Sequence, residues 1–264
     1  MSQSSRPLDA TSAELIQITI PVGMLQCNCT IIADPITREA LVIDPGDEVT
    51  RVLELLGRHK LTVKAIISTH AHIDHVGGLA KLRQYTGAPV LMHRDDLPLY
   101  HAMDVQASFL GVPAPEIVSI DQLLKEGDAL HWGSYQASVV HTPGHTPGSV
   151  CLYLPKSIPS AKSLGAAGTL GKLNSDKKPD NKNEAPILGI PNGNLTVPHL
   201  FAGDTLFAGS IGRTDLWGGS MEQIMDSLRT KLMELPDDTK VFPGHGVFTT
   251  ILQERETNPF LKRR

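Results

Sequence analysis

Three histidines and an aspartate lie within six residues of one another near position 70. Residues 69–75 read Thr-His-Ala-His-Ile-Asp-His and contain His70, His72, Asp74 and His75. Imidazole nitrogens and carboxylate oxygens are the groups with which proteins hold zinc and similar divalent ions. A single loop histidine is common and needs no metal, but four donors at this spacing predict a metal site.

The apolar, partly β-branched run at 63–68 directly before this cluster predicts a buried strand. The donors are therefore expected on a loop at the edge of a sheet. In extended backbone, side chains two positions apart point the same way, so His70 and His72 are expected to share one ion. Asp74 and His75 then turn toward another, and the stretch predicts two adjacent metal ions.

Three later donors repeat one pattern, in which an apolar strand is followed by a glycine and a potential ligand. They are His145 within 141–148, Asp204 within 200–205 and His245 within 241–246. The two oxygens of a carboxylate can span ions about 3.5–4 Å apart, so Asp204 is predicted to bridge the pair. Three histidines are left for one ion and an aspartate with two histidines for the other, namely His70, His72 and His145, and Asp74, His75 and His245.

The composition favours one large α/β domain. The chain has 264 residues, of which 41% are hydrophobic, enough for a substantial core. A formal net charge of −4 offers no overall attraction for phosphate backbones, so no nucleic acid partner is expected. Polar residues 1–14 lack the apolar core of a signal peptide, and no apolar stretch approaches the roughly 18 residues of a membrane span.

The cysteine content agrees with a cytoplasmic protein. Cys27, Cys29 and Cys151 are an odd number and form no disulfide framework, which suits a reducing compartment. They are expected to be small apolar core residues, because no further cysteine pair completes a soft-ligand metal site. We therefore expect a soluble, cytoplasmic protein with no membrane partner; the sequence leaves its oligomeric state open.

Residues 15–264 are expected to form the domain, after a flexible leader at 1–14. The segment 156–197 differs from its surroundings, with six lysines, three acidic residues and no aromatic residue. Such a composition buries too little apolar surface to offset its ordering entropy. It predicts an inserted loop, for which a solvated excursion is favoured over a lysine-rich flap above the substrate.

The motifs T-H-x-H-x-D-H, P-G-H-T-P-G, G-D-T-L-F and P-G-H-G resemble those of the metallo-β-lactamase superfamily. Within it, G-R-T-D at 212–215 and the tail at 254–261 are similar to the short bacterial glyoxalase II-like hydrolases. The resemblance runs from residue 15 to 261 with one interruption. It implies an α/β fold, a four-layer αβ/βα sandwich of two mixed β-sheets flanked by helices, with metals at one edge.

The resemblance also implies two divalent metal ions (Zn, Fe or Mn), held by the sets already described. One site takes His70, His72 and His145, the other Asp74, His75 and His245, and Asp204 belongs to both. The implied reaction is hydrolysis of a small-molecule thioester, with a hydroxide that bridges the metals as nucleophile and with Asp74 and Asp204 as catalytic carboxylates. The substrate is expected to be glutathione-derived, as in hydroxyacylglutathione hydrolases.

Two other activities fit the same scaffold. An iron-dependent persulfide dioxygenase shares the G-R-T-D pattern but uses one iron held by two histidines and an aspartate. That group usually has aspartate after the last motif histidine, where this chain has Gly246. Hydrolysis of a lactone or other ester is the second alternative. A non-catalytic binding module is disfavoured, because no ligand position is lost.

Three further residues are candidates for supporting or substrate-binding roles. An acid at the position of Asp44 braces the metal loop in the resembled family, but Asp44 within 44–47 could equally form a turn and cap the helix expected at 49–59. The planar guanidinium of Arg213 could orient Asp215, a metal ligand or an acidic substrate. An ordinary salt bridge is the alternative for Arg213.

Overall fold

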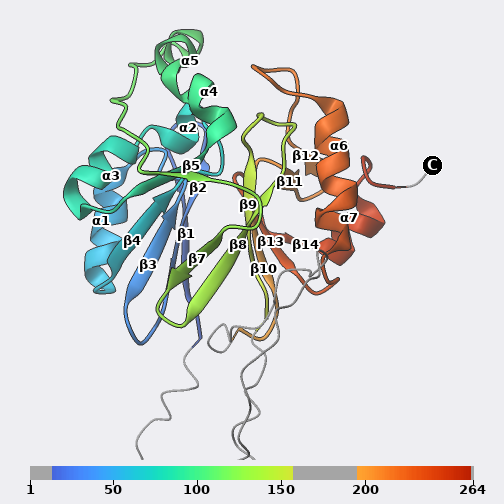
Figure 1. Ribbon diagram of the computed structural model, residues 1–264, viewed down its shortest axis with the longest axis horizontal. Helices are drawn as coiled ribbons and strands as arrows, with labels where there is room; N and C mark the ends of the chain where they lie inside the picture. The colour runs from blue at the N-terminus through green and yellow to red at the C-terminus, as the bar shows by residue number, and fades with distance from the viewer. Residues whose placement is uncertain (1–13, 157–194, 263–264) are drawn as a thin grey trace, which may run out of the picture.

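The computed structural model describes residues 14–156 and 195–262. The leader expected at 1–14 and the insertion expected at 156–197 lie outside these residues except at their ends. Two β-sheets face each other in the centre, and helices cover the outer face of each (Figure 1). This arrangement confirms the predicted α/β four-layer sandwich.

The first sheet combines an antiparallel and a parallel half. Among the described residues its strands follow the chain order: β1 (Ile16–Val22), β2 (Cys27–Ala33), β3 (Glu39–Ile43), β4 (Thr62–Ile67), β5 (Val90–His93) and β6 (Gln122–Leu124). Strands β1 to β3 pair antiparallel, because short turns join them. Strands β3 to β6 pair parallel, because helices or long connections return the chain between them.

The second sheet brings together strands from the later part of the chain. Its order within the described ranges is β14 (Thr249–Thr250), β13 (Lys240–Pro243), β10 (His199–Gly203), β9 (Val150–Leu154), β8 (Tyr135–His141) and β7 (Ala129–Trp132). Strand β10 pairs antiparallel with β9 and parallel with β13. Since β9 is also antiparallel to β8, the strands β8, β10 and β13 all end at the same edge. A short hairpin of β11 (Leu206–Phe207) and β12 (Ser210–Ile211) follows β10.

Helices from each half of the chain cover the nearer sheet (Figure 1). The first sheet carries α1 (Val49–Arg58), α3 (Leu79–Thr86), α4 (Leu97–His101) and α5 (Met103–Leu110), and the second carries α6 (Met221–Thr230) and α7 (Ile251–Thr257). The central strands are apolar on both faces: Ile31 packs toward the helices, whereas Ile32 packs between the sheets. No helix in the described ranges is long and apolar enough to cross a membrane.

The predicted side-chain cap of α1 is wrong. Glu48 precedes the helix in a left-handed conformation, with φ of 48°, and makes no capping hydrogen bond through its side chain. Helix α1 is instead stabilised by its apolar face, because Val49, Val52 and Leu56 are buried. The aspartate expected to cap it is used elsewhere, as described below.

A buried carboxylate joins the two sheets at the end where β2 finishes and β3 begins. Asp34 Oδ1 accepts hydrogen bonds from Ile36 N (2.7 Å) and Thr37 N (2.9 Å) in its own turn. Its Oδ2 accepts from the backbone N and Oγ of Ser134, at 2.7 and 2.8 Å, in the turn between β7 and β8. Burial alone raises the pKa of Asp34, but these hydrogen bonds outweigh it and hold the pKa below its usual value.

Replacing Asp34 by asparagine is expected to lower the free energy of unfolding at pH 7 by about 1–3 kcal/mol, because an amide has one acceptor oxygen and cannot accept the bonds from both turns. A lowered folded-state pKa adds stability that is complete above the unfolded-state pKa, near 3.9, and is lost as the pH falls through the folded-state pKa. The deficit should therefore shrink in acid. Urea unfolding of wild type, Asp34→Asn and the exposed control Asp226→Asn at pH 7 and about pH 3 tests this, and a deficit that is independent of pH contradicts it.

Candidate metal centre

The predicted donors come from strand ends that meet at one edge of the sandwich. His70 and His72 follow β4 in the first sheet. The other sheet contributes His145 after β8, Asp204 after β10 and His245 after β13, whose ends coincide because these strands run parallel. The glycine before His245 is needed for this approach, since a Cβ on Gly244 would collide with Asp204 Oδ1 and the His75 ring.

The segment after His72 is helical, whereas the sequence predicted a loop. Asp74 and His75 lie on the short helix α2 (Ile73–Val76), which buries Ile73 and Val76. The Gln106 side chain accepts a hydrogen bond from Ile73 N at 3.0 Å and so satisfies a free donor at the start of this helix. The turn places Asp74 and His75 at adjacent positions facing the donors of the second sheet.

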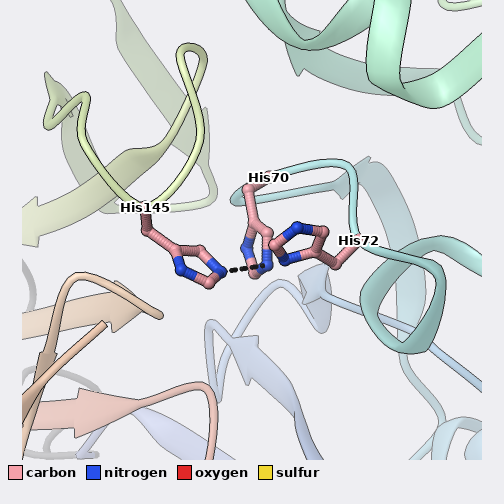
Figure 2. A group of neighbouring side chains, drawn as sticks. All are labelled: His70, His72 and His145. Atoms are coloured by element: carbon pink, nitrogen blue, oxygen red, sulfur yellow. Dashed lines mark hydrogen bonds between the residues drawn. The ribbon is translucent and has the colours of Figure 1, made fainter. Parts of the chain in front are cut away.

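The first trio consists of histidines. His70, His72 and His145 offer nitrogen atoms that lie within 4.8 Å of one another. Figure 2 shows His145 on the loop of the second sheet, pointing at His70 and His72 on the loop after β4. The Nε2 atoms of His70 and His145 are 3.2 Å apart. This is the set predicted for one ion.

The second trio combines a carboxylate with two imidazoles. His245 Nε2 lies 3.1 Å from Asp74 Oδ2 and 3.2 Å from His75 Nε2. Asp204 lies between the trios, because its Oδ1 is 3.4 Å from His75 Nε2 and its Oδ2 is 3.7 Å from both His145 Nε2 and His245 Nε2. All seven predicted donors are thus brought together, and Asp204 contacts members of both trios.

Each of three imidazoles is oriented by a partner on its outer nitrogen. His75 Nδ1 lies 3.0 Å from Asp44 Oδ2, and His145 Nδ1 donates to the backbone carbonyl of Arg213 at 2.8 Å. His70 Nδ1 is 3.1 Å from Thr69 Oγ1, whose own proton goes to Asp44 Oδ2 at 2.7 Å. In its neutral form each ring carries the proton on Nδ1, and its Nε2 then presents a lone pair to the centre of the cluster.

The protonation of these rings shows whether a cation suits the centre of the cluster. The pKa of His70 is held well below its usual value by burial and by the neighbouring imidazoles, and the pKa of His72 is lowered to about 3 for similar reasons. Neutral rings then point lone pairs at one another, which is unfavourable unless a cation lies between them. His72 Nε2 and Asp204 Oδ1 are buried and lack a hydrogen bond within the described part of the chain. The N and O donors present fit divalent ions.

The second trio is the more negative part of the cluster. For Asp74, burial raises the pKa, but His75 and His245 outweigh it, so the net pKa is lowered and the carboxylate is ionised at neutral pH. Burial lowers the pKa of His245, but the hydrogen bond to Asp74 and the charge of Asp204 raise it by more. The net pKa of His245 is therefore above its usual value. Carboxylates that raise the affinity of an imidazole for a proton attract a metal cation in the same way.

Asp44 braces the cluster, as the resembled family implied, and is not a helix cap. It is buried and accepts hydrogen bonds from Thr69 N and Thr69 Oγ1, both at 2.7 Å, besides its contact with His75. Its backbone is left-handed, with φ of 51°, a conformation that costs about 1–3 kcal/mol outside glycine. The strained turn after β3 places this carboxylate under the end of the adjacent strand β4.

Arg213 and Asp215 form an exposed ion pair next to the cluster. Two guanidinium nitrogens of Arg213 each lie 2.8 Å from an Asp215 oxygen, in a bidentate arrangement, and both side chains are more than half exposed. The carbonyl of Arg213, not its side chain, orients His145. The sequence drew attention to Arg213 but gave no sign of this backbone contact.

Asp96 is a supporting residue that the sequence analysis missed. This fully buried carboxylate accepts hydrogen bonds from Ala71 N at 2.8 Å, Thr146 Oγ1 at 2.8 Å and Gly148 N at 2.6 Å. Ala71 lies between His70 and His72, and Thr146 follows His145. Asp96 therefore links the ligand loops of the two sheets. Burial raises its pKa despite these bonds.

Gln106 is a second supporting residue without a sequence signal. Its amide nitrogen donates to the carbonyls of Ala71 and Leu99, both at 3.0 Å, while its oxygen accepts from Ile73 N. It is buried on α5, a helix that the sequence did not predict as a separate element. An arrangement of this kind, with ligands fixed by a second layer of hydrogen bonds, is characteristic of metal-binding enzymes.

Comparison with known proteins agrees with a metal-binding site. Residues 22–157 and 197–245 match the family profile described as "Metallo-beta-lactamase superfamily". The chain therefore belongs to this superfamily of metal-binding hydrolases. The hydroxyacylglutathione hydrolase GloC of Haemophilus influenzae is 32% identical over 247 residues, which cover 93% of this chain and 97% of that protein.

Two solved structures are similar over almost the whole described chain. The crystal structure of BLEG-1, a B3 metallo-beta-lactamase, has a TM-score of 0.73 with 32% identity, and the match covers 94% of this chain and all of that one. TTHA1623 in a di-iron-bound form has a TM-score of 0.68 with 33% identity and covers 92% and 100% of the two chains. Relatives thus share both the fold and a metal-binding character.

We expect Asp96→Ala to weaken metal binding by about 10–100-fold, because both ligand loops lose a shared acceptor. Titration of Zn²⁺ into a mixture of the protein and a chromophoric chelator measures the metal affinity without any substrate. Asp226→Ala is the control, since its carboxylate is exposed and remote from the donors. Thr146→Val, which removes only one donor to Asp96, should give a smaller loss. Equal metal affinity in Asp96→Ala and Asp226→Ala contradicts the assignment.

Proposed function

We propose that this protein is a metal-dependent hydrolase that cleaves thioesters. The observation that carries the proposal is the convergence of seven N and O donors, three of whose imidazoles are held with Nε2 toward a common centre. His70, His72 and His145 would hold one divalent ion, Asp74, His75 and His245 the other, and Asp204 would touch both. Zinc, iron and manganese all suit such donors.

When bound, two divalent ions supply a nucleophile from water at neutral pH and a Lewis acid for the substrate carbonyl. The chain itself offers the carboxylates of Asp74 and Asp204 to orient the attacking group and to accept its proton. Cys27, whose Sγ lies 3.5 Å from His75 Nδ1, is not proposed as a nucleophile, because burial raises the pKa of its thiol to about 12. A thiolate leaving group, with a pKa of about 8–9, leaves without a general acid.

The choice of thioester rests on the relatives. A protein named hydroxyacylglutathione hydrolase aligns along nearly the full chain, which supports a glutathione-derived thioester as the substrate class to test first. The cytoplasm is the proposed compartment, since Cys27, Cys29 and Cys151 are buried and unpaired. Ester or lactone cleavage and β-lactam cleavage are the hydrolytic alternatives, and persulfide oxidation is the alternative from another reaction class.

Metal analysis of purified protein is expected to give close to two ions per chain. Asp204→Ala should lose activity and lower the occupancy of both sites, because this carboxylate lies between the trios. His245→Ala should lower occupancy at one site. The exposed control Asp226→Ala should keep both ions. Elemental analysis beside S-lactoylglutathione hydrolysis measures this, and fully active wild type with a single ion would overturn the dinuclear proposal.

The requirement for O₂ distinguishes thioester hydrolysis from persulfide oxidation. Thioester cleavage should proceed under argon at the aerobic rate, and His75→Ala should lower kcat more than about 100-fold, since loss of even a supporting partner of a ligand costs 10–100-fold. A dioxygenase with one iron would tolerate His75→Ala better and would consume O₂ with glutathione persulfide. Parallel assays with S-lactoylglutathione, a lactone, a chromogenic cephalosporin and glutathione persulfide measure this, and O₂ uptake with negligible thioester cleavage would sink the proposal.

A further inference from the structure

An apolar cavity of about 320 Å³ lies beside the metal centre. We call it the acyl cavity, and most of its wall is aliphatic or aromatic: Pro98, Leu99, Ala102, Val105, Pro147 and Trp217. Its volume is at the lower end of the range for cavities that bind small molecules. The reaction proposed above leaves this space without a role.

The acyl cavity adjoins the cavity that contains the metal ligands, and the two share part of their walls. Trp217 and Gln106 line both this cavity and the adjoining one of about 290 Å³, whose wall includes His72, Asp74, His145, Asp204 and His245. The Trp217 ring centroid is 6.4 Å from that of His72 and 5.6 Å from that of Phe109, in edge-to-face arrangements. The acyl cavity thus lies next to the metal donors, with the Trp217 ring at the boundary between the two cavities.

The charges on these walls do not suit an anionic arm. Among residues 14–156 and 195–262, Arg213 is the one lysine or arginine that lines either cavity, and it is already paired with Asp215 through two bonds of 2.8 Å. The wall of the acyl cavity includes the half-exposed carboxylate of Asp95. Glutathione carries two carboxylates, so burying it here would place like charges together in an apolar space.

The acyl side of the thioester is thus the arm that fits. We propose that the acyl cavity binds the acyl group and that the preferred substrates carry an apolar acyl group, a medium-length aliphatic chain or a phenyl ring, while the thiol arm lies outside this cavity. The inference rests on the proposed thioester hydrolysis and adds the substrate class. A lactoyl group offers one methyl and leaves most of the cavity hydrated, so it is a poor match.

The size of the effect follows from the hydrophobic burial of each added methylene. Every methylene that leaves water for the acyl cavity is expected to raise kcat/KM about fourfold, until the cavity is full. Because the reaction centre is the same in each substrate, a series that differs only in acyl length reports on the cavity alone. Trp217, the aromatic residue in the wall of the acyl cavity, adds an edge-to-face contact for a phenyl group.

The test uses the metal-loaded full chain with S-acetyl-, S-butyryl-, S-hexanoyl-, S-phenylacetyl- and S-lactoylglutathione, with the released thiol as readout. Wild type should show kcat/KM rising along the aliphatic series and higher for phenylacetyl than for lactoyl. Val105→Trp fills the cavity and should lower the hexanoyl-to-acetyl ratio of kcat/KM toward one. Ile36→Trp, which adds the same bulk at an exposed turn, should keep the wild-type ratio.

The outcomes separate this inference from the proposed function. Cleavage of all the thioesters with no dependence on acyl length, or with lactoyl the best, overturns the acyl cavity and leaves thioester hydrolysis standing. An unchanged ratio in folded, metal-loaded Val105→Trp also overturns it. Should Val105→Trp fail to fold, Val105→Asp provides the second variant, because a carboxylate in the wall must also depress the hexanoyl rate selectively. No cleavage of any thioester by loaded wild type contradicts the proposed function itself.

Discussion

Two imidazole lone pairs that face each other across 3.2 Å repel, and the edge of this sandwich is built to hold His70 and His145 in that arrangement. Their outer nitrogens are fixed by Thr69 and by the carbonyl of Arg213, which prevents either ring from turning to relieve the repulsion. The energy to hold them comes from the folding of two sheets around a shared apolar core. A cation at the centre would convert the repulsion into coordination.

Two buried aspartates, Asp44 and Asp96, hold the metal donors in this arrangement through different contacts. Asp44 lies beneath the loop after β4 and fixes Thr69 and His75, within the first sheet. Asp96 lies on the other side and joins Ala71 to Thr146, across the sheets. The first sets the orientation of ligands and the second sets the separation of the loops that carry them. Either role requires a carboxylate, because each residue accepts three hydrogen bonds in the interior.

The seven donors could be predicted because their signal is local. Histidine and aspartate at two-residue spacing after an apolar run, and a glycine before His145, Asp204 and His245, are features of short stretches of sequence. The antiparallel opening of the first sheet followed in the same way from alternating strands and short turns. These features depend on contacts within a few residues, which periodicity and turn chemistry report.

The support of the site could not be predicted, because it depends on contacts between distant segments. Asp96 and Thr146 are 50 positions apart, and Gln106 reaches Ala71 across 35. An aspartate that braces a loop and one that caps a helix look alike in sequence, so the role of Asp44 was decided by the left-handed turn that aims it at β4. Helix α5 was missed because its apolar residues face the cavity beside the metal donors as well as the core.

In the proposed function, chemistry and specificity are carried by different parts of this fold. Five of the seven donors follow the ends of β4, β8, β10 and β13, and Asp74 and His75 lie on α2 shortly after β4, so they can change little without loss of the metal centre. The walls of the acyl cavity come from α4, α5 and the segment around Trp217, outside the sheets. Val105 and Phe109 on α5 are largely exposed and contribute little to the core. Such residues can vary at small cost in stability, so under the proposed function selection can alter the acyl group while the metal donors stay the same.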